Sequence, residues 1–432
     1  MVVGPFQQFT VAGGTKADLY LLRYDENGRS RSPQTERQLK ASLAGISDVF
    51  VFSHGWNSIF RNAVERYRNF ITGYIDERRK FGVPIPDGYR PLLIGVIWPS
   101  TSFVMPWEEG PEIPVFAGVP GRDVEEMLSF VTAGLDRPAN AELTELLDGR
   151  DALDRTEARR AAQILLAALR PEPDPDDGSP PPTLDEWLDA WSRMDPAPAG
   201  PGARRESLTA GDLQGLNPRD LLRAATVWKM KARAGKVGAA GLGPLARHVL
   251  ANSSARLHLI GHSFGAKLVL SALAAGTVPR KAHSVLLLQA AVNRWCFAAN
   301  VAGTGRAGGY QAVLDRVERP IMTTFSAHDE PLHDFFHLAL RGRNLGEQGF
   351  AAFGDPDLYG ALGGYGPSGL GPLALTDPAI AAGTQGYRLT GSHRVLALDG
   401  TGELAGHPAI GGHSDVSTPL TWWALHRLTT TA

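Results

Sequence analysis

A serine between two glycines is the strongest candidate for chemistry in this chain. Residues 256–267 read Arg-Leu-His-Leu-Ile-Gly-His-Ser-Phe-Gly-Ala-Lys, an apolar run that leads directly into Gly-His-Ser-Phe-Gly at 261–265. A helix-compatible segment, 266–275, follows at once. A G-x-S-x-G motif between a strand and a helix places its serine on a sharp turn that exposes the hydroxyl. The turn requires glycines because flanking side chains would collide with nearby backbone, and it holds the serine in a strained conformation. The pattern predicts that Ser263 is a nucleophile.

A serine hydroxyl is a weak nucleophile, so it needs a base that is itself oriented by a third group. With this motif the expected order along the chain is serine, acid, histidine. Asp329 directly follows the strand-like run 321–326, and Glu330 beside it is an alternative acid. For the base we favour His413, which lies in a glycine-rich turn shortly before the last helix. His407 is less suitable because a proline follows it.

Attack on a carbonyl also requires backbone donors for the oxygen on which charge develops. The N–H of Phe264, the residue after the nucleophile, is the first candidate. The second is the N–H of Trp56, because Gly55 before it allows the backbone to approach. The two aromatic rings would also line an apolar wall, although Trp56 could also be a core residue. We expect His54, Gly55 and His262 to border the substrate pocket.

The elements around these residues alternate between buried strands and amphipathic helices. Such alternation predicts an α/β fold with a mostly parallel central sheet and helices on both faces. One or two less certain edge strands fall within the first forty residues. The clearest strands are expected at 48–53, 91–99, 256–262, 283–292, 320–327 and 394–399, with helices at 58–80 and 419–428.

Two segments interrupt this alternation and divide the chain. We expect a core in two parts, 1–104 and 226–432, separated by a largely helical cap insertion at 105–225. The insertion contains a proline- and aspartate-rich tract, 171–182, which predicts an exposed loop. A glycine-rich segment, 341–391, is long for a loop and is expected near the mouth of the site.

The composition is that of an ordinary globular protein. The chain has 432 residues, of which 43% are hydrophobic, and a formal net charge of −2, which gives no electrostatic case for nucleic acid. Its single cysteine excludes an intrachain disulfide framework and cysteine-rich metal sites. No signal peptide and no apolar run of about 20 residues is found, so we expect a cytoplasmic protein without a membrane span. Its oligomeric state stays open.

These residues resemble the α/β-hydrolase superfamily, specifically the serine hydrolases that include esterases and lipases. The resemblance covers roughly residues 45–100 and 225–428. It implies acyl transfer to water through a covalent acyl-enzyme on Ser263, with a small-molecule or lipid-like ester as substrate and no cofactor or metal. It rests on His54-Gly55, the motif at 261–265, Asp329 after a strand, and His413 near the C-terminus.

Other functions use the same residues. The machinery could cleave amides or peptides, or pass the acyl group to another alcohol or amine. A catalytically silent scaffold that binds a ligand or partner is a further alternative, because a fold alone does not determine chemistry. The large insertion and the glycine-rich segment depart from the smallest members of the superfamily and leave substrate size open.

Overall fold

The computed structural model describes most of the predicted core and parts of the insertion. The remaining residues, which include the whole proline- and aspartate-rich tract, 171–182, and the whole of 341–359, lie outside the described part of the chain. The described residues are 3–56, 58–100, 128, 130–133, 135–147, 150, 152–169, 183–185, 188, 218–302, 305–335, 360–378, 380–383, 386–389 and 391–430.

A central sheet organises the described part of the chain. Its strand order is β1-β2-β4-β3-β5-β6-β7-β9-β8, and all neighbours are parallel except the antiparallel β1–β2 pair at one edge. The predicted α/β architecture is therefore confirmed. The strands are β1 (Gln7–Thr10), β2 (Lys16–Arg23), β3 (Asp48–Ser53), β4 (Pro91–Ile97), β5 (Arg256–His262), β6 (Ser284–Leu288), β7 (Ile321–Phe325), β8 (Ala374–Pro378) and β9 (Val395–Asp399).

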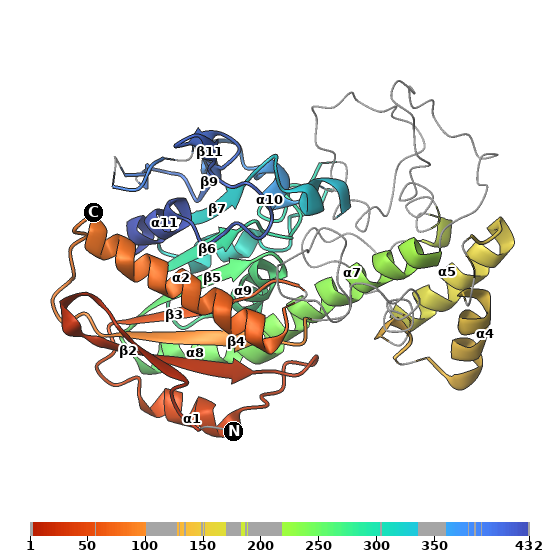
Figure 1. Cartoon of the computed structure of the whole chain (residues 1–432), viewed down its shortest axis with the longest axis horizontal. Helices are drawn as coiled ribbons and strands as arrows, with labels where there is room; N and C mark the ends of the chain where they lie inside the picture. The colour runs from red at the N-terminus through yellow and green to blue at the C-terminus, as the bar shows by residue number, and fades with distance from the viewer. Residues whose placement is uncertain are drawn as a thin grey trace.

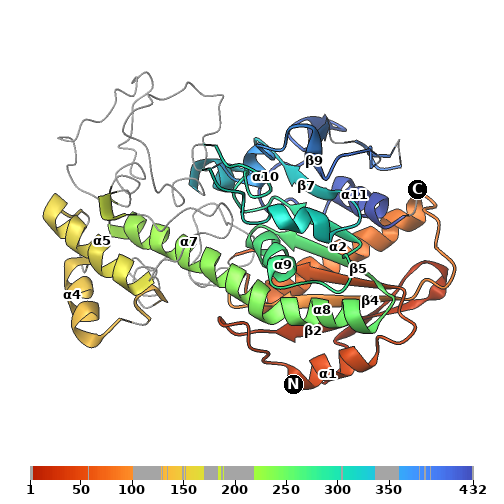
Figure 2. The ribbon, with the colours of Figure 1, turned by 180° about the vertical axis from the view of Figure 1, so that it is seen from behind.

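Helices cover both faces of this sheet and enclose two separate hydrophobic cores (Figures 1 and 2). The helices α2 and α11 pack together on one face, and α1, α7, α8 and α9 lie on the other. The helices are α1 (Pro33–Ala41), α2 (Phe60–Lys80), α4 (Arg137–Leu147), α5 (Arg155–Leu169), α7 (Pro218–Val237), α8 (Gly243–Asn252), α9 (Phe264–Ala274), α10 (Leu362–Tyr365) and α11 (Pro419–Thr429).

The strand order reverses between β3 and β5. The chain passes from β3 outward to β4, and β5 then pairs with the other side of β3. In open α/β sheets a crevice forms outside the carboxyl ends of strands at such a switch point, because the connecting loops diverge there. The loop after β3 begins with His54, and Ser263 directly follows β5.

The predicted insertion is visible only in part. In both views α4 and α5 lie beyond the carboxyl ends of the strands, beside the outer end of α7 (Figures 1 and 2). α7 begins at Pro218 and continues through a π-helical turn, Gly238–Leu242, into α8. One helix therefore crosses the boundary that the sequence placed between 225 and 226.

Two predicted elements differ from the structure. The strand expected at 283–292 ends at Leu288, because the next residue, Gln289, takes a positive φ of 44°. The segment 341–391 is not a continuous loop, since its described part contains α10 and the edge strand β8. The sequence obscured β8 because an edge strand is short and half-exposed, so it lacks the apolar run of the inner strands.

Four buried histidines make the fold sensitive to acid. Burial lowers the pKa of His54 and His258 to about 4 and that of His426 to about 3, and it lowers the pKa of His262 well below the usual value. In the unfolded chain these imidazoles titrate near 6.5, so between about pH 6.5 and 4 the unfolded state binds more protons. The free energy of unfolding should therefore fall as the pH falls through this range.

Denaturant unfolding followed by tryptophan fluorescence at pH 8.0, 6.5, 5.5 and 4.5 measures this dependence. Each histidine contributes at most about 1.4 kcal/mol per pH unit to the slope of the free energy of unfolding against pH. In a His426→Gln variant the slope should be shallower, because the amide retains a donor for the carbonyl of Tyr74 but does not titrate. A free energy of unfolding that stays constant from pH 6.5 to 4.5 would contradict the prediction.

Candidate active site

Ser263 lies on a sharp turn between β5 and α9. Its φ of 56° and ψ of −125° are strained for a residue with a side chain, as the sequence predicted. Both flanking glycines are required by packing. A Cβ on Gly261 would lie 2.5 Å from the carbonyl oxygen of Gly265, and one on Gly265 would lie 2.3 Å from that of Ser53. The turn therefore brings α9 against the end of β3.

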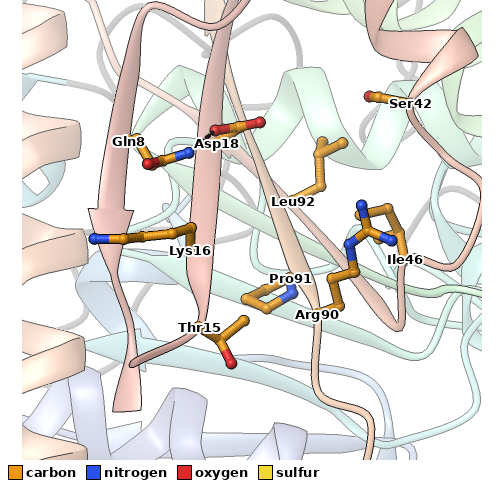
Figure 3. Close-up of a pocket in the computed structure, with 9 residues that line it drawn as sticks. All are labelled: Gln8, Thr15, Lys16, Asp18, Ser42, Ile46, Arg90, Pro91 and Leu92. Carbon is orange, nitrogen blue, oxygen red and sulfur yellow. Dashed lines mark hydrogen bonds between the residues drawn. The ribbon is translucent and has the colours of Figure 1, made fainter. Parts of the chain in front are cut away.

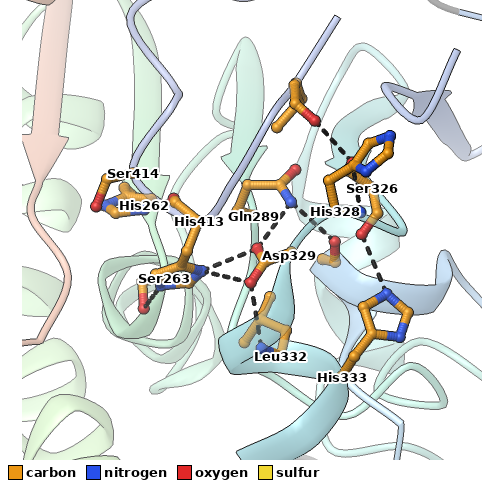
Figure 4. Close-up of polar contacts among 12 residues, drawn as sticks. His262, Ser263, Gln289, Ser326, His328, Asp329, Leu332, His333, His413 and Ser414 are labelled. Carbon is orange, nitrogen blue, oxygen red and sulfur yellow. Dashed lines mark hydrogen bonds and ion pairs between the residues drawn. The ribbon is translucent and has the colours of Figure 1, made fainter. Parts of the chain in front are cut away.

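The structure brings Ser263, His413 and Asp329 into one hydrogen-bonded chain (Figure 4). The distance from His413 Nε2 to Ser263 Oγ is 2.8 Å, and His413 Nδ1 lies 2.9 Å from Asp329 Oδ2 and 3.1 Å from Oδ1. An ionised carboxylate only accepts, so Nδ1 carries the proton and Nε2 accepts from the serine hydroxyl. The imidazole is thus in the tautomer that a general base requires.

Asp329 is fully buried at the end of β7 and has donors on both oxygens besides His413. The N–H of Leu332 donates to Oδ1 at 3.1 Å, and Gln289 Nε2 donates to Oδ2 at 2.8 Å. Glu330, the alternative acid, is exposed. The geometry therefore selects Asp329. Sequence reasoning missed Gln289, although a polar residue directly after an apolar strand was a usable signal.

The loop that carries His413 is held from three sides. The N–H of Ile410 donates to Gly400 O at 2.9 Å, and Ser326 Oγ donates to Ile410 O at 2.8 Å. On the other side, His262 Nε2 donates to the backbone carbonyl of His413 at 2.8 Å. His262 therefore positions the backbone of the histidine loop. The alternative base, His407, is exposed in the short strand β11 (His407–Pro408), which pairs with β10 (Glu403–Leu404).

The loop after β3 lies directly against the serine. His54 is buried, its ring stacks on Trp98 with centroids 5.6 Å apart, and its Nδ1 donates to Gly55 O at 2.9 Å. The Trp56 and Phe264 rings, which the sequence suggested as an apolar wall, are neighbours with their centroids 6.2 Å apart. Phe264 also begins α9, so its N–H lies at the positive end of a helix dipole.

Burial keeps both flanking imidazoles uncharged at neutral pH. Loss of water lowers the pKa of His54 to about 4, and loss of water, followed by the neighbouring His413, lowers that of His262 well below the usual value. The positive charge of Arg66 acts in the same direction on both rings. Of the three clustered imidazoles, only His413 has both the serine and the carboxylate as partners.

Gly55 cannot carry a side chain without displacing the serine. A Cβ at this position would lie 2.6 Å from Ser263 Cβ and 3.2 Å from its Oγ. We expect Gly55→Ala to lower kcat at least 100-fold in any Ser263-dependent reaction, because a 1 Å displacement of a reacting group is sufficient for such a loss.

The matched control is Gly82→Ala, because Gly82 has no atom within 4 Å of its would-be Cβ. Gly82 has a φ of 59°, so this variant should lose some stability but retain its activity. Measurement of kcat alongside the melting temperature separates the two effects. Unchanged kcat in Gly55→Ala would show that the loop does not adjoin the reacting serine.

A second group of serine, histidine and aspartate lies at the opposite ends of the same strands. His258 Nδ1 is 2.8 Å from Ser284 Oγ, and its Nε2 is 3.0 Å from Asp48 Oδ1. Arg256 also pairs with Asp48 at 2.7 Å. Ser284, His258 and Asp48 are at most 1% exposed, so no substrate reaches them. Residue types alone therefore do not distinguish the two groups, whereas the strained backbone of Ser263 and the partly exposed side chain of His413 do.

A shallow cleft of about 310 Å³ lies at the amino ends of β2 and β4 (Figure 3). Two of its lining side chains pair with each other, since Gln8 Nε2 donates to Asp18 Oδ1, and a third, Lys16, donates from Nζ to Thr10 Oγ1. The cleft lies at the end of the sheet opposite to Ser263, and it contributes nothing to the site. Within the described ranges no cluster of three or more histidine, cysteine, aspartate or glutamate side chains could hold a metal ion. None of the described helices is long and apolar enough to cross a membrane.

Comparisons of the chain with protein-family models, with curated proteins and with solved structures found no significant match.

Proposed function

We propose that the protein is a serine hydrolase with the α/β-hydrolase fold and that it cleaves carboxylic esters. The observation that carries the proposal is the Ser263–His413–Asp329 chain on a strained turn at the switch point of the sheet. A buried carboxylate, an oriented imidazole and a serine hydroxyl in this order are the parts that acyl transfer requires.

The reaction follows from the atoms at the site. Ser263 Oγ attacks the acyl carbon while His413 Nε2 accepts the hydroxyl proton. Asp329 holds the proton on Nδ1 and stabilises the imidazolium that forms. His413 then gives its proton to the departing alcohol, and the acyl group remains on Ser263 as an ester. A water molecule, deprotonated by the same imidazole, attacks this ester and releases the acid.

The negative charge on the attacked oxygen requires preorganised donors. We assign this role to the backbone N–H groups of Phe264 and Trp56. Phe264 begins α9, where the helix dipole favours negative charge. Gly55 lies against Ser263, and this closeness supports a role for the adjacent Trp56 N–H as the second donor. The Trp56 and Phe264 rings would contact the acyl group.

The test is hydrolysis of p-nitrophenyl esters from C2 to C16, run beside a Ser263→Ala variant as the blank. A maximum hydrolysis rate on short acyl chains would indicate an esterase with a narrow pocket. A maximum rate on long acyl chains would indicate a site that accepts lipids. Labelling of Ser263 by a fluorophosphonate measures the nucleophile without a chosen substrate. A matched amide and an added alcohol acceptor distinguish amide cleavage and acyl transfer. Failure of the wild-type protein both to hydrolyse any ester and to label would overturn the proposal.

A further inference from the structure

Gln289 lies directly behind the buried carboxylate, at the end of the neighbouring strand. It follows β6, is completely buried, and takes a φ of 44°, a left-handed conformation that is costly for a residue other than glycine. Such strain persists only where the surroundings over-determine it, and it is concentrated at functional sites. In Figure 4 the Gln289 amide lies beside Asp329 on the side away from Ser263.

The orientation of this amide is fixed by its partners. Gln289 Nε2 lies 2.8 Å from Asp329 Oδ2 and 3.0 Å from Gly363 O, and both of these atoms only accept hydrogen bonds. Gln289 Oε1 accepts from Thr324 Oγ1 at 2.9 Å, while the same hydroxyl accepts from the Gln289 backbone N–H at 3.0 Å. A flipped amide would set its oxygen against a carboxylate and a carbonyl. Both amide hydrogens are therefore committed, one of them to Asp329.

We propose that Gln289 is a positioning residue of the reaction, which holds the Asp329 carboxylate in place and stabilises its charge by donating from Nε2 to Oδ2. This inference rests on the proposed function. The atom that receives the Gln289 hydrogen bond, Oδ2, is also the nearer acceptor of His413 Nδ1. Gln289 therefore acts on the nucleophile through two intermediaries, Asp329 and His413.

The mechanism predicts a specific kinetic signature. A hydrogen bond to a charged carboxylate favours the ionised form, so its loss increases the proton affinity of the Asp329–His413 pair. In Gln289→Leu the acid limb of the kcat/KM–pH profile should shift to higher pH. kcat should fall by about 10- to 100-fold, the range that corresponds to one hydrogen bond to a charged group. KM should stay unchanged, because the amide does not contact substrate.

Gln289→Glu provides the sharper comparison, because it keeps the shape of the side chain and replaces the donating amide group by a carboxyl group. Two carboxyl groups at this distance share a proton, and only the protonated one can donate to Asp329. The variant should retain activity in a narrow pH range and acquire a new descending limb on the alkaline side, where the shared proton is lost. A residue with a structural role alone would not produce this limb.

Ser284→Ala is the matched control at the other end of β6. It removes a buried hydrogen bond of the same strand, the 2.8 Å contact with His258, so it should lower the melting temperature and leave the pH profile unchanged. The rate at which a fluorophosphonate labels Ser263, measured from pH 5 to 10 on folded protein, is the common readout. Wild-type protein that neither labels nor hydrolyses any ester would overturn the proposed function itself. Normal labelling with wild-type pH profiles in both Gln289 variants would overturn this inference alone.

Discussion

Ser263→Ala should abolish ester hydrolysis while the protein remains folded. The variant removes one atom, Oγ, which donates a hydrogen bond to His413 Nε2 at 2.8 Å, and it retains the Cβ that packs against Gly55. Alanine takes the same strained backbone conformation as serine, so the strain at this turn is unchanged. Removal of a nucleophile of this type lowers kcat by about 10⁵-fold or more, and the remaining rate derives from binding and the oxyanion donors.

The control for this variant is a second hydroxyl deletion on the same helix. Ser271 is buried on α9, where its Oγ contacts Tyr310 Oη at 2.8 Å, far from the reacting atoms. Ser271→Ala should lose about 1 kcal/mol of stability and keep its kcat. Hydrolysis rates and thermal unfolding are measured on all three proteins. Residual turnover of Ser263→Ala within tenfold of wild type would eliminate Ser263 as the nucleophile.

Asp329→Asn should lower kcat by about 10⁴-fold, although the asparagine side chain has nearly the same shape as that of aspartate. Both carboxylate oxygens receive donors in addition to His413, from Leu332 N–H on Oδ1 and from Gln289 Nε2 on Oδ2. Whichever way the new amide turns, its NH₂ group faces one of these donors and cannot accept from them. The imidazole then loses the partner that fixes its tautomer, and a serine facing the wrong tautomer is not activated.

Asp399→Asn is the matched variant for this test. Asp399 also lies at the carboxyl end of a strand, but its Oδ1 accepts from the N–H of Thr401 in a turn. The replacement leaves an acceptor for that bond, so activity should stay near that of the wild type. Single-turnover measurement of the acylation rate at pH 8 compares the two variants. Equal rates for Asp329→Asn and wild type would show that another group orients His413.

The sequence by itself determined the strands and the residues that follow them. Apolar runs of β3, β5 and β7 are readable because both sheet faces are covered by helices, so nearly every residue in these strands is buried. The residues that follow each run, directly for His54 and Ser263 and four positions after β7 for Asp329, are then fixed near the carboxyl edge of the sheet. That is why His54, Ser263 and Asp329 could be predicted without coordinates.

Only the tertiary structure decided which polar residues act together. Asp329 and Glu330 are adjacent in sequence, yet only Asp329 is buried and hydrogen-bonded to His413. His258 with Ser284 and Asp48 has the same residue types as the Ser263, His413 and Asp329 group but is buried at the opposite ends of the strands. Spacing along the chain cannot reveal such differences, because hydrogen bonding and burial depend on loops that converge from distant parts of the sequence.

The role of Gln289 has the same origin. Its neighbours Asp329 and Gly363 are 40 and 74 positions away along the chain, and they meet it only because β6 and β7 lie side by side. A sequence shows a polar residue after an apolar strand, whereas the direction in which its amide points is set by the packing of three segments.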